Sequence, residues 1–193
     1  MEPQPPIRDP NELEGLLAER EEELRQFRLA LDVLSPIDPS TGTLNRNGVI
    51  DAIQDALDWL TRRNDPFAIL AVEIPGLQAI STSAAERHQG IQQHLEAVLE
   101  AALRKVDRVG HVDHTTFAAV LREFKIEGNQ VLLERLRAIL QMESERASLV
   151  PTDPAFTLVS IKPGPFHRAG SLLEQVEALR TRSSPGSPLI IEL

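Results

Sequence analysis

The chain has 193 residues, of which 41% are hydrophobic, so it can bury one substantial core. A net charge of −9 argues against nucleic acid and anionic membranes as general partners, because both surfaces would repel it. The absence of cysteine excludes disulfides, thiolate metal sites and cysteine nucleophiles. No apolar run approaches the roughly 18 residues that span a bilayer, and the N-terminus lacks the apolar core of a secretory signal. We therefore expect a soluble, cytoplasmic protein of bacterial type.

The N-terminal region is predicted to be a proline-rich disordered segment, residues 1–9, followed by a helix over residues 10–35. Asp9 supplies an N-cap, and Pro10 suits the first helical position. Apolar residues then recur in alternating four- and three-residue steps: Leu13, Leu17, Leu24, Phe27, Leu31 and Leu34. This heptad stripe predicts a coiled coil that joins two copies of the chain as a homodimer. A single amphipathic helix folded onto the following domain is the alternative.

The segment after this helix is DPSTGTLNR, residues 38–46. Gly42 permits a turn conformation that other residues avoid, and Asp38 and Asn45 can accept hydrogen bonds from backbone N–H groups around it. The segment resembles the D-x-L-T-G-L-x-N-R motif at the start of GGDEF (diguanylate cyclase) domains. Five motif positions match, and Ser40 and Thr43 replace the two motif leucines.

Residues 103–121 predict a helix end, a short strand, a tight turn and a second strand. The arrangement resembles the hairpin of the same family, whose Gly-Gly-Asp-Glu-Phe signature falls on Asp113, His114, Thr115, Thr116 and Phe117. Only the phenylalanine matches. Because the turn motif and the hairpin arrangement are similar while the signature is mostly replaced, the chain is identified as a degenerate relative of GGDEF domains.

The remaining pattern alternates helices and strands in the order that this resemblance implies. A nearly continuous apolar run at residues 67–74 predicts a central strand covered on both faces. Further helices are predicted at 48–63, 91–104, 131–140 and 171–182, strands at 156–161 and 189–191, and a connection at 143–154. The predicted fold class is α+β, with a central mixed β-sheet of the GGDEF, nucleotidyl-cyclase-like type flanked by helices. Residues 36–193 would form this domain.

The resemblance also implies where a cyclase site would lie, and four of its elements are missing. In the family, the central strand ends in an Asp-x-Asp sequence, and its first aspartate and an acid in the hairpin hold two magnesium ions. Here Glu73 stands at the first aspartate position and Pro75 at the second, and Thr115 and Thr116 replace the hairpin acids. The guanine-reading asparagine maps to Ser81 and the phosphate-binding lysine to the neighbourhood of Ser183. We expect no catalytic residues, no metal and no cofactor, with a residual enzyme or GTP binder using Glu73 and Asp113 as the weaker alternative.

The cluster His111, Asp113 and His114 contains residue types that bind metals. On a strand, however, His111 and Asp113 point one way while His114 begins the turn. We therefore expect solvated turn residues rather than a metal site.

One functional motif of the family is retained. Arg104 and Asp107 form an R-x-x-D sequence that is separated from the signature positions by five residues. In GGDEF proteins a motif at this spacing forms the inhibitory site for cyclic di-GMP. Arginine can grip a phosphate or the guanine edge, and aspartate can accept from guanine N–H groups. A second arginine is expected nearby, with Arg108, Arg135 and Arg137 as candidates. The alternative is a solvated pair that caps the helix C-terminus.

These patterns predict a catalytically inactive regulatory module that dimerises and binds cyclic di-GMP at Arg104 and Asp107. The alternative is a scaffold that binds an unknown protein partner and no nucleotide.

Overall fold

The computed structural model describes residues 10–39, 41–81, 85–164 and 167–193. The predicted disorder of residues 1–9 lies outside them. The chain divides into two compact units, residues 1–35 and 36–193, which are described separately.

The first unit contains a single helix, α1 (Pro10–Leu34), in agreement with the predicted helix. Three members of the heptad stripe have described side chains, and each exposes more than half of its surface: Leu17 62%, Leu24 58% and Phe27 64%. The side chains of Leu13, Leu31 and Leu34 lie outside the described part of the chain. On the outer face of α1, Arg25 pairs with Glu22 one turn earlier, at 2.7 Å.

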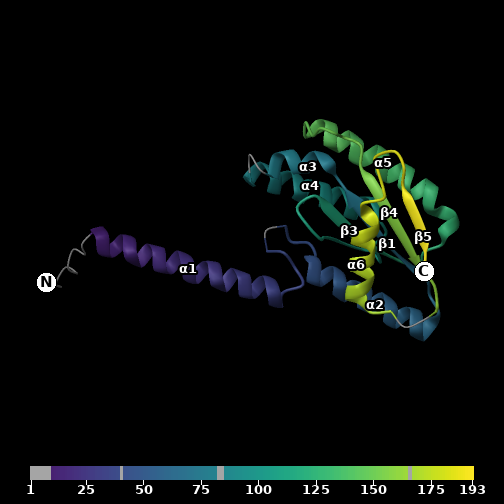
Figure 1. The fold of residues 1–193 in the computed structure, drawn as a ribbon, viewed down its shortest axis with the longest axis horizontal. Coiled ribbons are helices and arrows are strands. Elements are labelled where there is room, and N and C mark those ends of the chain that lie inside the picture. The colour runs from purple at the N-terminus through teal and green to yellow at the C-terminus, as the bar shows by residue number, and fades with distance from the viewer. Residues whose placement is uncertain (1–9, 40, 82–84, 165–166) are drawn as a thin grey trace. The chain divides into compact units, whose positions relative to one another are not determined.

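The second unit is built on a five-stranded mixed sheet with the order β2-β3-β1-β4-β5 (Figure 1). The strands are β1 (Phe67–Glu73), β2 (Arg108–His111), β3 (Thr116–Arg122), β4 (Ala155–Ile161) and β5 (Leu189–Glu192). β1 lies at the centre and pairs antiparallel with β3 and β4, while β2 pairs antiparallel with β3 and β5 runs parallel to β4. The predicted α+β class, the central strand and the hairpin are therefore confirmed.

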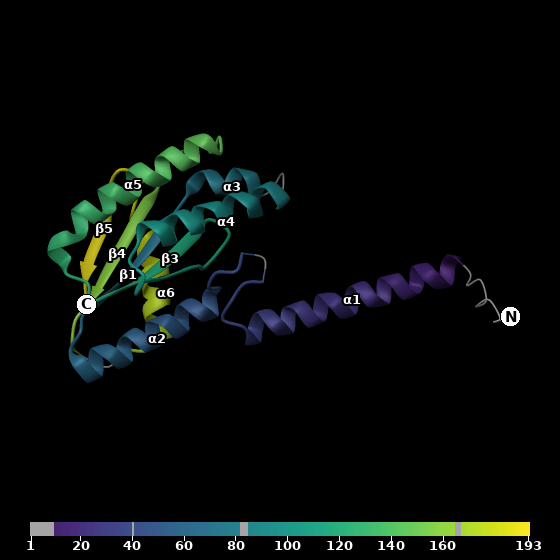
Figure 2. The same cartoon turned by 180° about the vertical axis from the view of Figure 1, so that it is seen from behind.

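Helices cover both faces of this sheet, as Figures 1 and 2 show. One layer contains α3 (Pro75–Ser81), α4 (Ala85–Ala102) and α5 (Asn129–Arg146), and the other contains α2 (Arg46–Arg63) and α6 (Ala169–Arg180). Successive side chains of a strand point to opposite faces. In β1, Leu70 and Val72 accordingly pack in the core beneath α3, α4 and α5, whereas Ile69 and Ala71 pack beneath α2 and α6. Burial on both faces explains why this strand has no polar alternation.

One prediction about an individual element is wrong, and one short helix was not predicted. The predicted connection at 143–154 begins too early, because α5 continues to Arg146. Its polar last turn is stabilised where Glu143 pairs with His94 at 2.8 Å and with Arg146 at 2.6 Å. The sequence analysis also missed the short helix α3, which begins at Pro75, a residue whose fixed φ suits a first helical position.

Among the helices that the structure describes, none combines the length and the apolar character needed to cross a membrane.

Candidate functional site

The described part of the turn around Gly42 has the local structure that its sequence predicts. Gly42 adopts φ 77°, a left-handed conformation that favours glycine. Asp38 Oδ1 accepts from the Thr41 backbone N–H at 3.3 Å, and Asn45 Oδ1 caps α2 by accepting from the Gly48 N–H at 3.0 Å. The two polar side chains therefore satisfy backbone donors, as expected.

A buried polar network fastens this turn to the sheet and to α4. Glu96 of α4 is fully buried, and its carboxylate accepts from the Thr43 hydroxyl at 2.7 Å and contacts His111 Nδ1 at 2.9 Å. The other ring nitrogen of His111 lies 3.1 Å from Asp38 Oδ2. Burial alone would lower the pKa of His111, but the hydrogen bond and charge of Glu96, with those of Asp38, outweigh burial and raise it.

The three residues considered as a metal cluster point to different partners. His111 faces Glu96, Asp113 faces α6, and the His114 ring lies 6.0 Å from the ring of His88. The expectation of solvated turn residues is wrong for His111, which is largely buried and paired. Within the described ranges, no group of three or more histidine, aspartate and glutamate side chains could hold a metal ion.

The end of the β2–β3 hairpin contains the residues that align with the GGDEF signature. Phe117 is buried against the sheet core, which explains why an apolar residue is retained there. Thr116 lies directly opposite Glu73 in the β1–β3 register, and both Thr115 and Thr116 are buried. Asp113 accepts from the Thr115 backbone N–H at 2.8 Å, a local bond typical of tight turns.

Arg180, at the end of α6, occupies the space between these residues. Its Nη1 donates to Asp113 Oδ2 at 2.8 Å and to the Thr116 hydroxyl, and its Nε lies 3.8 Å from Glu73 Oε2. Burial alone would raise the pKa of Asp113, but the Thr115 N–H and the Arg180 guanidinium outweigh it and lower this pKa. Arg180 was not among the predicted site residues, because the family's phosphate-binding lysine maps near Ser183. The Ser183 hydroxyl donates to the Arg180 carbonyl at 2.8 Å.

This donor set does not fit the pair of magnesium ions that the fold family implies. Magnesium requires several oxygen ligands converging in a near-octahedral arrangement. The two carboxylates at the hairpin end, Glu73 and Asp113, both face the guanidinium of Arg180, and the Thr116 hydroxyl is a third acceptor for the same group. Pro75 begins α3 and has no side-chain ligand to offer. One of the two negative charges here is therefore offset by a residue of the chain itself.

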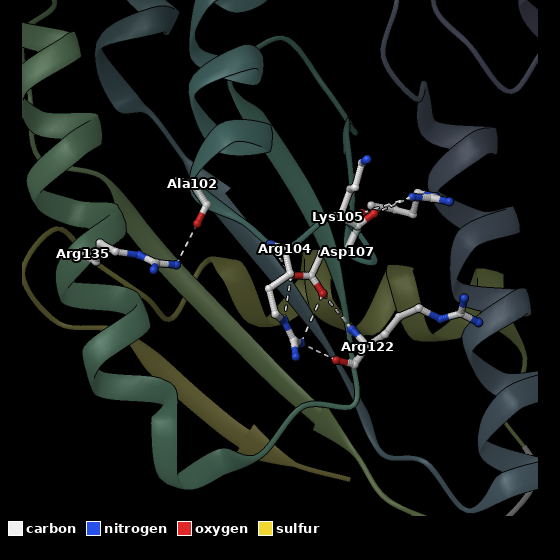
Figure 3. A network of polar contacts seen from close by, with 7 residues as sticks. Ala102, Arg104, Lys105, Asp107, Arg122 and Arg135 are labelled. Atoms are coloured by element: carbon white, nitrogen blue, oxygen red, sulfur yellow. Dashed lines mark hydrogen bonds and ion pairs between the residues drawn. The ribbon is translucent and has the colours of Figure 1, made fainter.

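Arg104 and Asp107 lie side by side between α4 and β2, with Asp107 buried (Figure 3). The Asp107 carboxylate accepts from the backbone N–H groups of Arg104 at 3.0 Å and of Arg122 at 3.1 Å. The Arg104 guanidinium contacts Asp107 at 3.4 Å and donates to the Arg122 carbonyl. The alternative of a solvated pair is thus wrong for Asp107, whose carboxylate accepts from N–H groups beyond α4 rather than capping that helix.

Two pockets meet at Arg104. One, of about 500 Å³, is lined by Arg104, Arg135 and Lys125 over an apolar floor that includes Phe124 and Leu132. The other, of about 460 Å³, is lined by Arg104, Lys105, Arg108 and the turn at Gly42–Leu44. Both volumes fall in the range of small-molecule sites.

The structure separates the three candidates for a second arginine. Arg135 donates to the Ala102 carbonyl at 2.7 Å, as Figure 3 shows. This bond holds its guanidinium beside the larger pocket. Arg108 lines the smaller pocket. Arg137 lines neither of these two pockets, because it pairs with Asp153 and lies over the ring of Phe156.

No protein-family model matches the sequence, and no curated protein matches it significantly. Solved structures do match. The GGDEF domain of FimX from Pseudomonas aeruginosa has a TM-score of 0.67 and 13% identity, covering 82% of this chain and 99% of that one. The coiled coil and GGDEF domain of DgcB from Caulobacter crescentus, in complex with cyclic di-GMP, has a TM-score of 0.65 and 15% identity, covering 94% and 99%.

A third match is the diguanylate cyclase SiaD in complex with its activator SiaC, also from Pseudomonas aeruginosa. Its TM-score is 0.62 at 15% identity, over 94% of this chain and 71% of that one. At such identities the likeness concerns the fold, and the strand order and hairpin described above agree with it. The sheet and its covering helices form a domain with the GGDEF fold.

Proposed function

We propose that this chain is a catalytically inactive regulatory module that binds cyclic di-GMP at Arg104. The observation that carries the proposal is the position of this guanidinium, which is half exposed at the border of two pockets that each contain a further arginine. Arg135 lies in one pocket and Arg108 in the other. Several of the matched structures contain cyclic di-GMP, which supports the same ligand class here.

The chemistry of the ligand agrees with this arrangement. Cyclic di-GMP presents two phosphates and two planar guanines, so it needs cations on both sides of its ring and apolar surface for the bases. An arginine has five N–H donors in a planar fork, and Arg104 directs only some of them to Asp107 and Arg122. Leu132 and Phe124 supply apolar surface beside Arg135. We therefore rank Arg135 first as the second arginine, before Arg108.

The residues at the hairpin end support the proposal that this domain is catalytically inactive. A cyclase that uses two magnesium ions needs carboxylates free to coordinate them. Here Arg180 engages Asp113 and faces Glu73, and Pro75 and Thr116 stand where further acids would be required. This supports a regulatory rather than an enzymatic role.

Calorimetric titration with cyclic di-GMP tests the binding proposal. Saturable binding is expected, and Arg104→Ala should weaken it about 10- to 100-fold, because a charge-assisted contact is lost. Arg135→Ala should also weaken binding, whereas Arg137→Ala is the matched control on the same helix and should not. If no heat or saturation is detected at several hundred micromolar ligand, the sensor proposal is wrong. A protein-binding scaffold then takes its place, and the SiaD–SiaC complex supports that role for the fold.

We also propose that α1 joins two copies of the chain. The described stripe residues Leu17, Leu24 and Phe27 are exposed within a single copy, and burying them against a second helix would stabilise the dimer. The match that includes the coiled coil of DgcB covers 94% of this chain, which supports the proposal.

A further inference from the structure

Trp59, on α2, lies between two arginines. The residue is 39% exposed, and the guanidinium carbon of Arg63 lies 4.1 Å from the centroid of its ring. The guanidinium carbon of Arg122 lies 5.0 Å from the same centroid. Both distances are within the range of a cation–π contact. Beside the ring is a pocket of about 210 Å³, lined by apolar residues that include Ala56, Phe67 and Val106.

Arg122 belongs to two sites at once. It is the last residue of β3, and its backbone N–H and carbonyl are held by Asp107 and Arg104, respectively. Its side chain extends away from Arg104, as Figure 3 shows, and reaches Trp59 and the Asp55 carbonyl on α2. The backbone of one residue therefore lies in the R-x-x-D site, while its guanidinium covers the tryptophan.

The strand end at Arg122 lies opposite Phe67 in the β1–β3 register. The next residue, Glu123, has φ 49°, a left-handed backbone conformation that residues other than glycine rarely adopt. The following residue, Phe124, donates its N–H to the Pro66 carbonyl at 3.0 Å. Arg122 is thus held by its pairing with β1 and, in addition, by its backbone bonds to Arg104 and Asp107.

We propose that Arg122 couples occupancy of the Arg104 site to the exposed surface around Trp59. The inference rests on the proposed binding of cyclic di-GMP at Arg104. A phosphate oxygen forms a stronger bond with a guanidinium than a neutral carbonyl does, so a bound ligand competes with the Arg122 carbonyl for Arg104. Release of this carbonyl removes one of the bonds that hold the end of β3 and changes how Arg122 stacks on Trp59. The ligand thus selects between two arrangements of the same surface.

The coupling can be tested without ligand. The chain has one tryptophan and no tyrosine, so its intrinsic fluorescence reports on Trp59 alone. Arg104→Ala removes the bond to the Arg122 carbonyl and should change the emission maximum and intensity of the ligand-free protein. Arg135→Ala is the matched control, because Arg135 lines the same pocket but bonds to Ala102, and its spectrum should equal that of the wild type. Equal spectra for Arg104→Ala and the wild type would overturn the coupling.

A titration with cyclic di-GMP tests the same coupling in the bound state. Wild-type emission should change saturably, with the midpoint found by calorimetry. Arg122→Met removes the guanidinium but keeps the backbone bonds to Arg104 and Asp107, so binding should persist while the emission change is lost. Arg63→Ala removes the other stacked arginine and should keep the ligand-dependent change. An undiminished change in Arg122→Met would reject the relay and leave the proposed function intact. A complete lack of binding would reject the proposed function, and the ligand-free comparison would still decide the coupling.

Discussion

Arg180 Nη1 lies 2.8 Å from Asp113 Oδ2, which fixes the end of α6 to the tip of the β2–β3 hairpin. The two residues are 67 positions apart in the sequence, and the same guanidinium also reaches Thr116. A permanent cation is thereby placed among the carboxylates of the hairpin end. A guanidinium is charged at every physiological pH, so Arg180 offsets one of the two negative charges of Asp113 and Glu73 without a metal ion.

The first prediction concerns catalysis. Incubation of the protein with GTP and magnesium should yield no cyclic dinucleotide, because too few free carboxylates remain to hold two metal ions. Arg180→Ala should not restore activity, since Pro75 and Thr116 still lack carboxylate ligands. Chromatography of the reaction mixture measures the outcome. Product formation that disappears in Glu73→Ala would show that the site is active.

The second prediction concerns the stabilising role of Arg180. Its replacement by alanine should lower the free energy of unfolding by about 1–3 kcal/mol, because Asp113 and the buried Thr116 hydroxyl lose a charged partner. Arg46→Ala is a matched control, since Arg46 also pairs with a residue of α6, Glu177, at 2.6 Å, but is more exposed. Its loss should cost at most about 1 kcal/mol. Chemical denaturation of the two variants measures the difference, and equal losses would contradict the role given to Arg180.

Most elements of the fold were predictable because their signals are local. The apolar run of β1 and the three- and four-residue spacing in α2 and α4 depend only on neighbouring residues. The exceptions also have physical causes. Pro75 normally ends a predicted helix but begins α3, and α3 is too short for its period to be recognised. The last turn of α5 is polar, and its Glu143 pairs with His94, which lies 49 positions away in the sequence.

The candidate site was predictable only where a motif marks it. Arg104 and Asp107 follow a spacing that can be recognised in the sequence, whereas Glu96 resembles any acidic residue on a helix. Its burial follows from contacts with Thr43, 53 positions away, and with His111, 15 positions away. The role of Arg180 likewise arises from contacts between distant segments, which no local pattern encodes.

The third prediction concerns the pH dependence contributed by His111. Its pKa is raised in the folded protein, whereas in the unfolded chain it is about 6.5. The folded protein therefore binds the His111 proton more tightly than the unfolded chain does, and the resulting stability is fully present below about pH 6.5. It is lost as the pH rises through the raised folded pKa. The thermal midpoint of the wild type should accordingly fall on going from neutral to alkaline pH.

Two variants test whether this dependence belongs to the network. His111→Gln removes the titrating group, so its stability should lie below that of the wild type at pH 6 and approach it at alkaline pH. Glu96→Gln removes the buried charge that raises the pKa of His111 and should flatten the same pH window. A wild-type pH profile in both variants would assign the dependence to other groups. Asp113 does not interfere, because its lowered pKa makes its contribution disappear only under acidic conditions.

The last prediction concerns α1. Leu17 and Leu24 are seven residues apart and belong to a stripe with the period of a two-stranded coiled coil. The double substitution Leu17→Glu and Leu24→Glu would place charges in the seam, so light scattering should show a dimer for the wild type and a monomer for this variant.

Arg20 interrupts the stripe and pairs with Glu23 of its own helix. Because a charged residue in the seam weakens association, Arg20→Leu should shift the equilibrium toward the dimer at lower protein concentration. A monomeric wild type at high micromolar concentration, unchanged by Arg20→Leu, would instead favour a single amphipathic helix.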